Sequence, residues 1–278
     1  MRKISTEDIT KTVRDLCMAA ACDLEPDVAG ALKAAEAAEE SPLGREVIGQ
    51  IITNYGIAAT EARPMCQDTG ITVLFVEVGR DVEISGPLDV ALNEGVRRGY
   101  EEGYLRKSVC DPLTRANTGD NTPAIIHTRV VEGDRLRIRI APKGAGSENM
   151  SRLKMLKPSE GVEGIRDFVV ETVREAGGNP CPPIVLGVGI GGDFEMSAIL
   201  AKKALLRPVG TANGREDVAA IERDLLERVN ALGIGPMGFG GTVTALAVHA
   251  EVHPCHIASL PVAVNIQCHA DRHKEAEI

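Results

Sequence analysis

Residues 184–206, which read IVLGVGIGGDFEMSAILAKKALL, decide the fold class. The first five are apolar and rich in β-branched side chains, which predicts a short buried strand. After a run of glycines, residues 194–206 are rich in Ala, Leu and Lys, which predicts a helix. A strand followed directly by a helix is typical of folds that mix both kinds of element.

The same mixture continues on both sides of this stretch. The sequence predicts an α/β (mixed α+β) fold in which a helical segment, about residues 1–62, precedes alternating helices and strands of a single domain, 1–278. We expect a hairpin in which the segment Glu132-Gly133-Asp134 joins strands 124–131 and 135–140. The other expected helices span residues 6–22 (capped by Ser5 or Thr6), 27–40, 42–59, 86–103, 161–175 and 215–232, and the other strands span 71–78, 244–249 and 259–266.

Composition narrows the possible functions. There are 31 Lys and Arg against 40 Asp and Glu, so the net charge is −9, which disfavours nucleic acid and anionic membranes as partners. We find neither a secretory signal nor a membrane span of about 20 apolar residues, and we therefore expect a cytoplasmic protein. Thiols stay reduced there, so the seven cysteines suggest metal ligands or buried thiols rather than disulfides.

The segment Cys66-Gln67-Asp68-Thr69-Gly70 has an unusual density of reactive side chains. A soft thiolate suits iron–sulfur iron or zinc, and Asp68, two residues on, could serve as a general acid or base. An Asx-type turn with an incidental cysteine would explain the same residues.

Two further regions carry possible metal ligands. Cys181 lies in the segment Gly177-Gly178-Asn179-Pro180-Cys181-Pro182-Pro183, where the prolines restrict the backbone and also suit a sharp turn. Towards the C-terminus, His253, Cys255 and His256 could form a zinc site, and Cys268 follows them, but no regular ligand spacing is present. Cys17 and Cys22 lie on an Ala-rich helix and suit the core.

Two glycine-rich segments have alternative explanations. Residues 187–192 match GxGxxG after a strand and before a helix, the setting of a dinucleotide site, but no acidic residue ends a strand about 20 positions on. In residues 143–149, Lys-Gly-Ala-Gly-Ser-Glu-Asn, the glycines would let backbone amides approach a carboxylate closely, or would simply form a loop.

Taken together, the motifs resemble those of the iron-dependent class I fumarases and the related L(+)-tartrate dehydratases, in their α subunit or N-terminal region. The matching segments occur in family order and span residues 66–70, 105–109, 117–123, 143–149, 187–193, 235–241 and 256–268.

This resemblance implies a [4Fe–4S] cluster held by three cysteines, Cys66, Cys181 and Cys268, which are 115 and 87 residues apart. Three ligands leave one iron open to act as a Lewis acid on the substrate hydroxyl. The implied reaction interconverts (S)-malate and fumarate, and dehydration of L(+)-tartrate to oxaloacetate is the alternative.

The resemblance also assigns roles to polar residues. It implies that Asp68 exchanges a proton with the hydroxyl, that Gln67 and Arg106 bind the substrate, and that His256 orients a proton relay. Backbone amides around Gly144 and Gly146 would help to hold a carboxylate.

The length of the chain matches the α subunit, so a β subunit is expected to complete the site, in an α2β2 assembly or a similar one. Alone, the chain is then expected to be inactive. A zinc protein and a non-catalytic regulatory subunit are the competing hypotheses.

Overall fold

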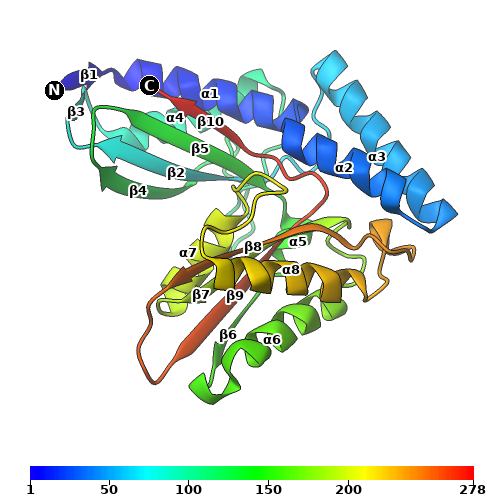
Figure 1. Cartoon of the computed structure of the whole chain (residues 1–278). Coiled ribbons are helices and arrows are strands. Elements are labelled where there is room, and N and C mark those ends of the chain that lie inside the picture. The colour runs from blue at the N-terminus through cyan, green and yellow to red at the C-terminus, as the bar shows by residue number, and fades with distance from the viewer. The chain divides into compact units, whose positions relative to one another are not determined.

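A computed structural model describes residues 1–278, and these residues form two compact units. Unit 1 comprises residues 1–25, 54–145 and 272–278, and unit 2 comprises residues 26–53 and 146–271. Figure 1 shows helices and strands in each unit, which confirms the mixed α/β class. That residues 1–278 act as a single cluster-binding domain stays a prediction.

Unit 1 is built on a four-stranded sheet. The strand order is β10-β5-β2-β4, in which β2 pairs in parallel with β4 and antiparallel with β5. A separate parallel pair is formed by β1 and β3. The elements are β1 (Arg2–Ile4), α1 (Thr6–Cys22), β2 (Ile71–Gly79), β3 (Val82–Ile84), α4 (Leu88–Glu102), β4 (Ile125–Val131), β5 (Leu136–Lys143) and β10 (Lys274–Glu277).

The predicted hairpin is wrong. Both strands form, but β2 lies between β4 and β5, so they do not pair with each other. The connecting turn instead bonds to the end of β2: Asp81 N–H donates to Gly133 O at 2.9 Å, and Gly79 N–H donates to Arg135 O at 2.8 Å. A local pattern predicted the strands and the turn but could not show that a strand from earlier in the chain separates them.

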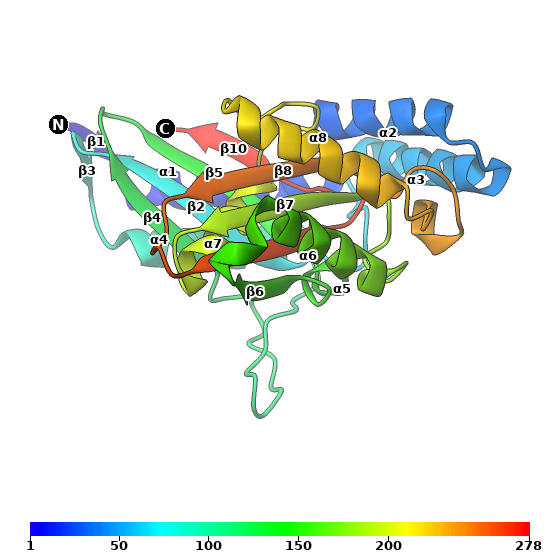
Figure 2. The ribbon, with the colours of Figure 1, turned by 60° about the horizontal axis from the view of Figure 1, so that its bottom comes forward.

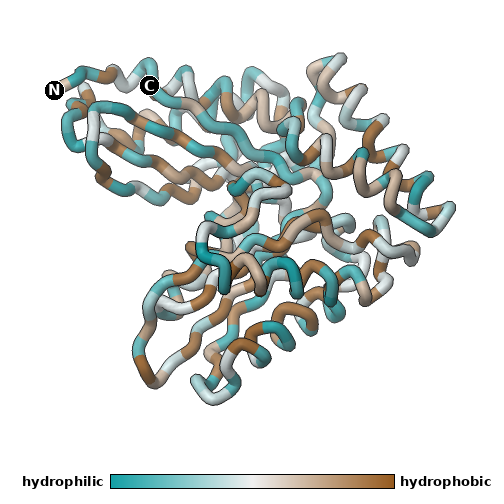
Figure 3. The backbone as a smooth tube through the Cα atoms, in the orientation of Figure 1, coloured by the Kyte–Doolittle hydropathy of each residue, from teal (hydrophilic) through white to brown (hydrophobic).

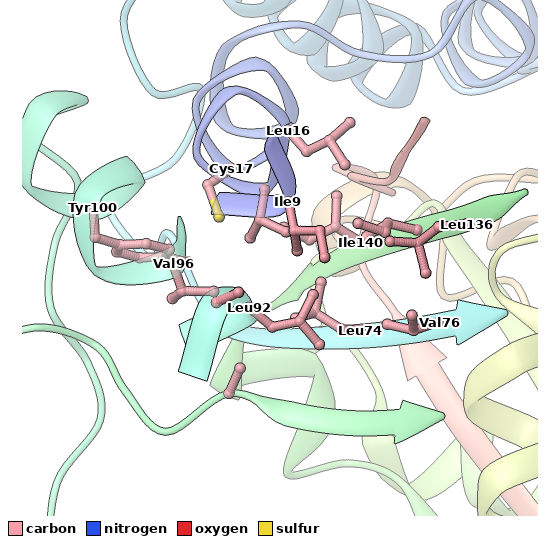
Figure 4. Packing of buried hydrophobic residues seen from close by; sticks show 14 of the residues in the cluster. Ile9, Leu16, Cys17, Leu74, Val76, Leu92, Val96, Tyr100, Leu136 and Ile140 are labelled. Carbon is pink, nitrogen blue, oxygen red and sulfur yellow. The ribbon is translucent and has the colours of Figure 1, made fainter. Parts of the chain in front are cut away.

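The core of unit 1 lies between the sheet and the helices α1 and α4 (Figure 4). Ile9, Val13 and Leu16 recur at the spacing of one helix face and are buried. In β5, the buried Leu136, Ile138 and Ile140 alternate with Arg137 and Arg139, as is typical of a strand with one face in the core. The alternating hydropathy along this strand is visible in Figure 3. Cys17 is fully buried in this core, as predicted, and burial raises the pKa of its thiol to about 12.

Unit 2 is built on a second four-stranded sheet, of order β6-β9-β7-β8. Strand β7 pairs in parallel with β8 and antiparallel with β9. Figure 2 shows α6, α7 and α8 beside these strands. The elements are α2 (Pro26–Ala38), α5 (Ala145–Glu148, which crosses the boundary), β6 (Arg152–Leu156), α6 (Gly161–Ala176), β7 (Ile184–Gly191), α7 (Phe194–Ala204), α8 (Glu216–Asn230), β8 (Ala245–His253) and β9 (Leu260–Gln267).

Helix α3 (Pro42–Glu61) is divided between the units at residue 53, and 3-10 turns occur at Pro158–Glu160 and Pro236–Gly238. Ser5 caps α1, as expected, because its side chain accepts a hydrogen bond from Asp8 N–H at 3.0 Å. None of the helices is both long and apolar enough to cross a membrane.

The glycines of the GxGxxG match have a packing role. A Cβ added to Gly187 or Gly189 would lie 2.0 Å from Ala201 O or 1.9 Å from Ser197 O, both on α7. Helix α7 therefore packs with its backbone directly against β7. At Gly191, where φ is +88°, a Cβ would lie 1.9 Å from His253 O. Close backbone approach explains these glycines without a nucleotide.

Candidate functional site

The loop of residues 66–70 joins α3 to β2 in unit 1. Asp68 Oδ1 accepts a hydrogen bond from Gly70 N–H at 3.0 Å, so the Asx-type turn considered as the simpler explanation is present. Cys66 is half-buried, and its thiol donates to Gln67 Oε1 over 3.5 Å. The turn fixes the carboxylate, while the thiol and the exposed amide remain at the surface of the unit.

A second backbone donor holds the other carboxylate oxygen of Asp68. Ala145 N–H donates to Asp68 Oδ2 at 2.8 Å. Because Gly144 has no side chain, the backbone before Ala145 can approach this carboxylate: a Cβ at Gly144 would lie only 3.2 Å from Asp68 Oδ2. The predicted residues Asp68 and Gly144 are therefore brought together in unit 1, and the carboxylate has a single fixed orientation.

The loop of residues 66–70 is hydrogen-bonded to the segment that carries Arg106. Thr69 Oγ1 donates to Arg106 O at 2.8 Å, while the Arg106 side chain is exposed. The buried Tyr100 hydroxyl also holds this loop, because it lies within hydrogen-bond distance of two of its carbonyl oxygens: 2.8 Å from Thr69 O and 3.0 Å from Gly70 O. A guanidinium that is exposed on a fixed backbone is well suited to bind a carboxylate from solution.

Sequence reasoning missed two residues that support this half of the site. Asn121 is fully buried, accepts a hydrogen bond from Ser108 N–H at 2.7 Å, and donates one to Gly70 O at 3.2 Å. Arg272 is 2% exposed, and its Nη2 would lie 3.5 Å from a Cβ at Gly144. Only the position of Asn121 within a matching motif could have indicated the first, whereas a buried arginine next to the C-terminus gives no local signal.

In unit 2 the structure brings Cys181 and Cys268 close together. Strand β7 begins just after Cys181 and β9 ends just before Cys268, and the two strands are antiparallel, with Val185 opposite Gln267. His269 N–H donates to Cys181 O at 3.3 Å. Both cysteines are half-buried, and none of the seven cysteines forms a disulfide.

Cys181 has a strained backbone. Its φ is +57°, in the left-handed region that is unfavourable for a residue with a side chain by roughly 1–2 kcal/mol. The turn is held by hydrogen bonds from Cys181 N–H to Gly178 O at 3.1 Å and from Met237 N–H to Pro182 O at 2.8 Å. Strain that is maintained by the surrounding structure often marks a functional position.

Gly146 belongs to the same end of unit 2. A Cβ at Gly146 would lie 4.0 Å from Asn179 O, two residues before Cys181. Gly146, Cys181 and Cys268 therefore gather at one end of the sheet of unit 2, while Cys66, Gln67, Asp68, Arg106 and Gly144 belong to unit 1.

His256 is not brought to the cysteines of its own unit. It follows β8, whose last residue, His253, lies opposite Gly191 at the far end of β7. Six residues of β7 separate this pairing from that of Val185, which corresponds to about 20 Å of strand. The exposed loop that carries His256 therefore lies at the opposite end of the sheet from Cys181 and Cys268.

The residues of the zinc hypothesis are engaged locally. His253 Nδ1 lies 2.8 Å from Pro254 O, Cys255 Sγ donates to Ser259 O at 3.2 Å, and His256 Nδ1 accepts from Ala258 N–H at 3.1 Å. Within each unit, no three His, Cys, Asp or Glu side chains are arranged to hold a metal ion. His253, Cys255 and His256 therefore do not form a preformed zinc site.

One buried titratable group lies outside the candidate site. His249 on β8 is 1% exposed, and burial, together with the positive charge of Arg207, lowers its pKa from 6.5 to about 4. Between these two values, the unfolded chain binds a proton that the folded chain does not. The unfolding free energy should therefore fall by up to about 3 kcal/mol as the pH drops from 6.5 to 4.

Chemical denaturation of wild type and of His249→Gln across this pH range would measure that loss. We expect the variant to lose less stability on acidification than wild type does. The control His253→Gln removes an exposed histidine and should behave as wild type. Equal acid sensitivity of all three proteins would contradict the assignment.

Comparison with known proteins identifies the family. The model of the family described as "Fumarate hydratase (Fumerase)" matches residues 10–277. The chain is 47% identical over 271 residues to the "Putative L(+)-tartrate dehydratase subunit alpha" of Methanocaldococcus jannaschii, covering 95% of each chain. It is 34% identical over 268 residues to the L(+)-tartrate dehydratase subunit alpha of Escherichia coli K12, covering 95% of this chain and 88% of the relative. The chain therefore belongs to the fumarate hydratase (Fumerase) family, as its motifs predict.

Proposed function

We propose that this chain is the α subunit of a two-subunit [4Fe–4S] hydro-lyase that interconverts (S)-malate and fumarate. The observation that carries the proposal is the loop of residues 66–70. In a chain of the fumarate hydratase family, this loop presents the thiol of Cys66 two residues from a carboxylate fixed by two backbone N–H groups.

Cys66, Cys181 and Cys268 are the proposed cluster ligands. Their chemistry fits, because all three are half-buried thiols on constrained loops and none is used in a disulfide. The strained turn at Cys181, and the hydrogen bond that Cys181 O accepts from His269 N–H, next to Cys268, support a shared role for these two cysteines. When bound, such a cluster supplies an open iron that polarises a substrate hydroxyl as a Lewis acid.

Asp68 is the proposed proton-transfer group. Its two hydrogen bonds from Gly70 and Ala145 orient the carboxylate but leave further lone pairs for a substrate hydroxyl or water. Arg106 would form two parallel hydrogen bonds with one substrate carboxylate, and the exposed Gln67 amide would bind beside it. Backbone groups at Gly144 and Gly146 would complete the contacts that this chain makes with the substrate.

If His256 takes part in the same reaction, it must be supplied by another chain. Because this chain places it at the opposite end of β7 from Cys181, His256 would have to come from a second copy of the chain. We retain it in the proposal only in that form.

A β subunit is the proposed partner, and α2β2 or a similar assembly is the proposed complex. The support is that the relatives covered over 88–95% of their length are named as α subunits. We also propose a cytoplasmic location, where the cluster thiols stay reduced.

Dehydration of L(+)-tartrate to oxaloacetate is the second candidate, favoured by the names of those relatives. Steady-state rates of the reconstituted α–β complex on (S)-malate, fumarate and both enantiomers of tartrate would separate the two. We expect kcat/KM to be highest for the malate–fumarate pair. A higher value for L(+)-tartrate would assign the second function, and no turnover of any of them would contradict both.

A further inference from the structure

Strand β4 is an open edge of the sheet in unit 1. It lies outermost in the order β10-β5-β2-β4 and is visible at the edge in Figure 1. Five of its seven residues, Ile-Ile-His-Thr-Arg-Val-Val, are β-branched aliphatics or Thr, and its single formal charge is Arg129. Ile125 is 45% exposed and Val130 is 69% exposed. A strand of this kind readily pairs with another chain unless something protects it.

The other three edges of the two four-stranded sheets are more strongly protected. Strand β10 carries three charged residues in the sequence Lys-Glu-Ala-Glu, and β6 carries the exposed Arg152 and Lys154. On β8, side chains of α8 occupy both ends of the edge: Glu222 accepts from Ala250 N–H at 2.7 Å, and Asn230 Oδ1 accepts from Ala245 N–H at 2.8 Å. Strand β4 has a single charge, Arg129, among its seven residues, and the Asn93 side chain of α4 accepts a hydrogen bond from Ala124 N–H, at 2.9 Å, just before the first residue of the strand.

The sequence of β4 is complementary to itself. When two copies run antiparallel about Thr128, every apolar residue meets a β-branched apolar residue. The opposed pairs are Ile125 with Val131, Ile126 with Val130, His127 with Arg129, and Thr128 with its own copy. Pairs of β-branched residues and Thr–Thr pairs are favourable across antiparallel strands.

The charges select this register. If the two strands paired about Arg129 instead of Thr128, Arg129 would lie directly opposite its own copy, and the two like charges would destabilise the pair. The Thr128-centred register avoids that repulsion and keeps the apolar residues opposed. A strand from an unrelated protein would not require this symmetry, whereas a second copy of the same chain does.

We infer that β4 is a homotypic interface, at which two copies of this chain pair antiparallel about Thr128 to join their sheets. The inference concerns the assembly of the chain and does not depend on its activity.

Cross-linking tests the register. Thr128→Cys should form a disulfide with its own copy under mild oxidation, identified by mass spectrometry as a peptide joined at position 128. An equimolar mixture of His127→Cys and Arg129→Cys chains should cross-link to each other, and neither should do so alone. The wild-type chain, treated in the same way, shows how much cross-linking the native cysteines cause. Val90→Cys, at an exposed position outside β4, shows how much arises from random collision. Absence of the 128–128 product, or the same yield from Val90→Cys, would overturn the inference.

A matched pair of charge substitutions tests the surface without added thiols. Val130 and Val90 are 69% and 64% exposed, but only Val130 lies on β4. Analytical ultracentrifugation over a concentration series should show dimers for wild type and Val90→Lys, and at least a tenfold weaker association for Val130→Lys. Equal association of both variants would overturn the inference. So would a Val130→Lys chain that still dimerises but no longer binds its β subunit, because the edge would then serve a different partner.

Discussion

Replacing Asp68 with Asn is expected to lower kcat of the α–β complex by about 10²–10⁴-fold. Asn cannot exchange the proton, although it has nearly the same shape. It also loses one of the two backbone hydrogen bonds, which reduces stability by about 1 kcal/mol, so the variant should still fold. The measurement is kcat of purified complexes with equal iron content, together with thermal unfolding of each variant.

The matched control is Asp111→Asn. Asp111 also caps backbone N–H groups in unit 1, at 2.9 Å from Leu113 N and 2.7 Å from Thr114 N, but in a different exposed loop. Its kcat should be close to that of wild type. If Asp68→Asn retained wild-type kcat, the chain would be better explained as a regulatory subunit that only shapes its partner.

Gly189→Ala is expected to cause the largest loss of stability. Its Cβ would lie 1.9 Å from Ser197 O, a backbone atom of α7 that cannot move without displacing the helix from β7. Overpacking typically reduces the unfolding free energy by roughly 1–3 kcal/mol, and we expect about 3 kcal/mol here because the clash is with backbone. Chemical denaturation of the purified variant measures this loss of unfolding free energy. Failure to obtain folded protein would also agree with the prediction.

Gly30→Ala is the control of opposite sign. Gly30 lies on α2 in the same unit, and a Cβ there would meet nothing within 4 Å. Alanine at such a helical position should raise the unfolding free energy by roughly 0.5–1 kcal/mol. If Gly189→Ala were as stable as wild type, close packing would not be the reason for the glycines of β7.

Local patterns predicted most elements of the fold. Residues 6–22 were expected as a helix, and α1 spans Thr6–Cys22, because capping and apolar periodicity act within a few residues. Local patterns do not predict the short strands β1, β3, β6 and β10, because runs of three to five residues that contain one to three charges resemble loops. Sheet order was mispredicted at β4 and β5 because strand pairing depends on distant segments.

The site was less accessible to local reasoning. The density of polar residues around Cys66 and Asp68 could be recognised in the sequence, but no spacing rule links Cys181 to Cys268. They meet because β7 and β9 are antiparallel neighbours, which only the sheet register reveals. Likewise, twelve residues separate His256 from Cys268 in sequence, yet β9 lies between them and carries them to opposite ends of the sheet.

Anaerobic determination of iron, acid-labile sulfide and zinc, on the chain purified with its β subunit, tests the central claim most directly. We predict about four irons and about four sulfides per chain. Both should fall to background in Cys181→Ala and should be unchanged in Cys255→Ala, whose cysteine is exposed. Stoichiometric zinc without iron, or full iron in Cys181→Ala, would contradict the account.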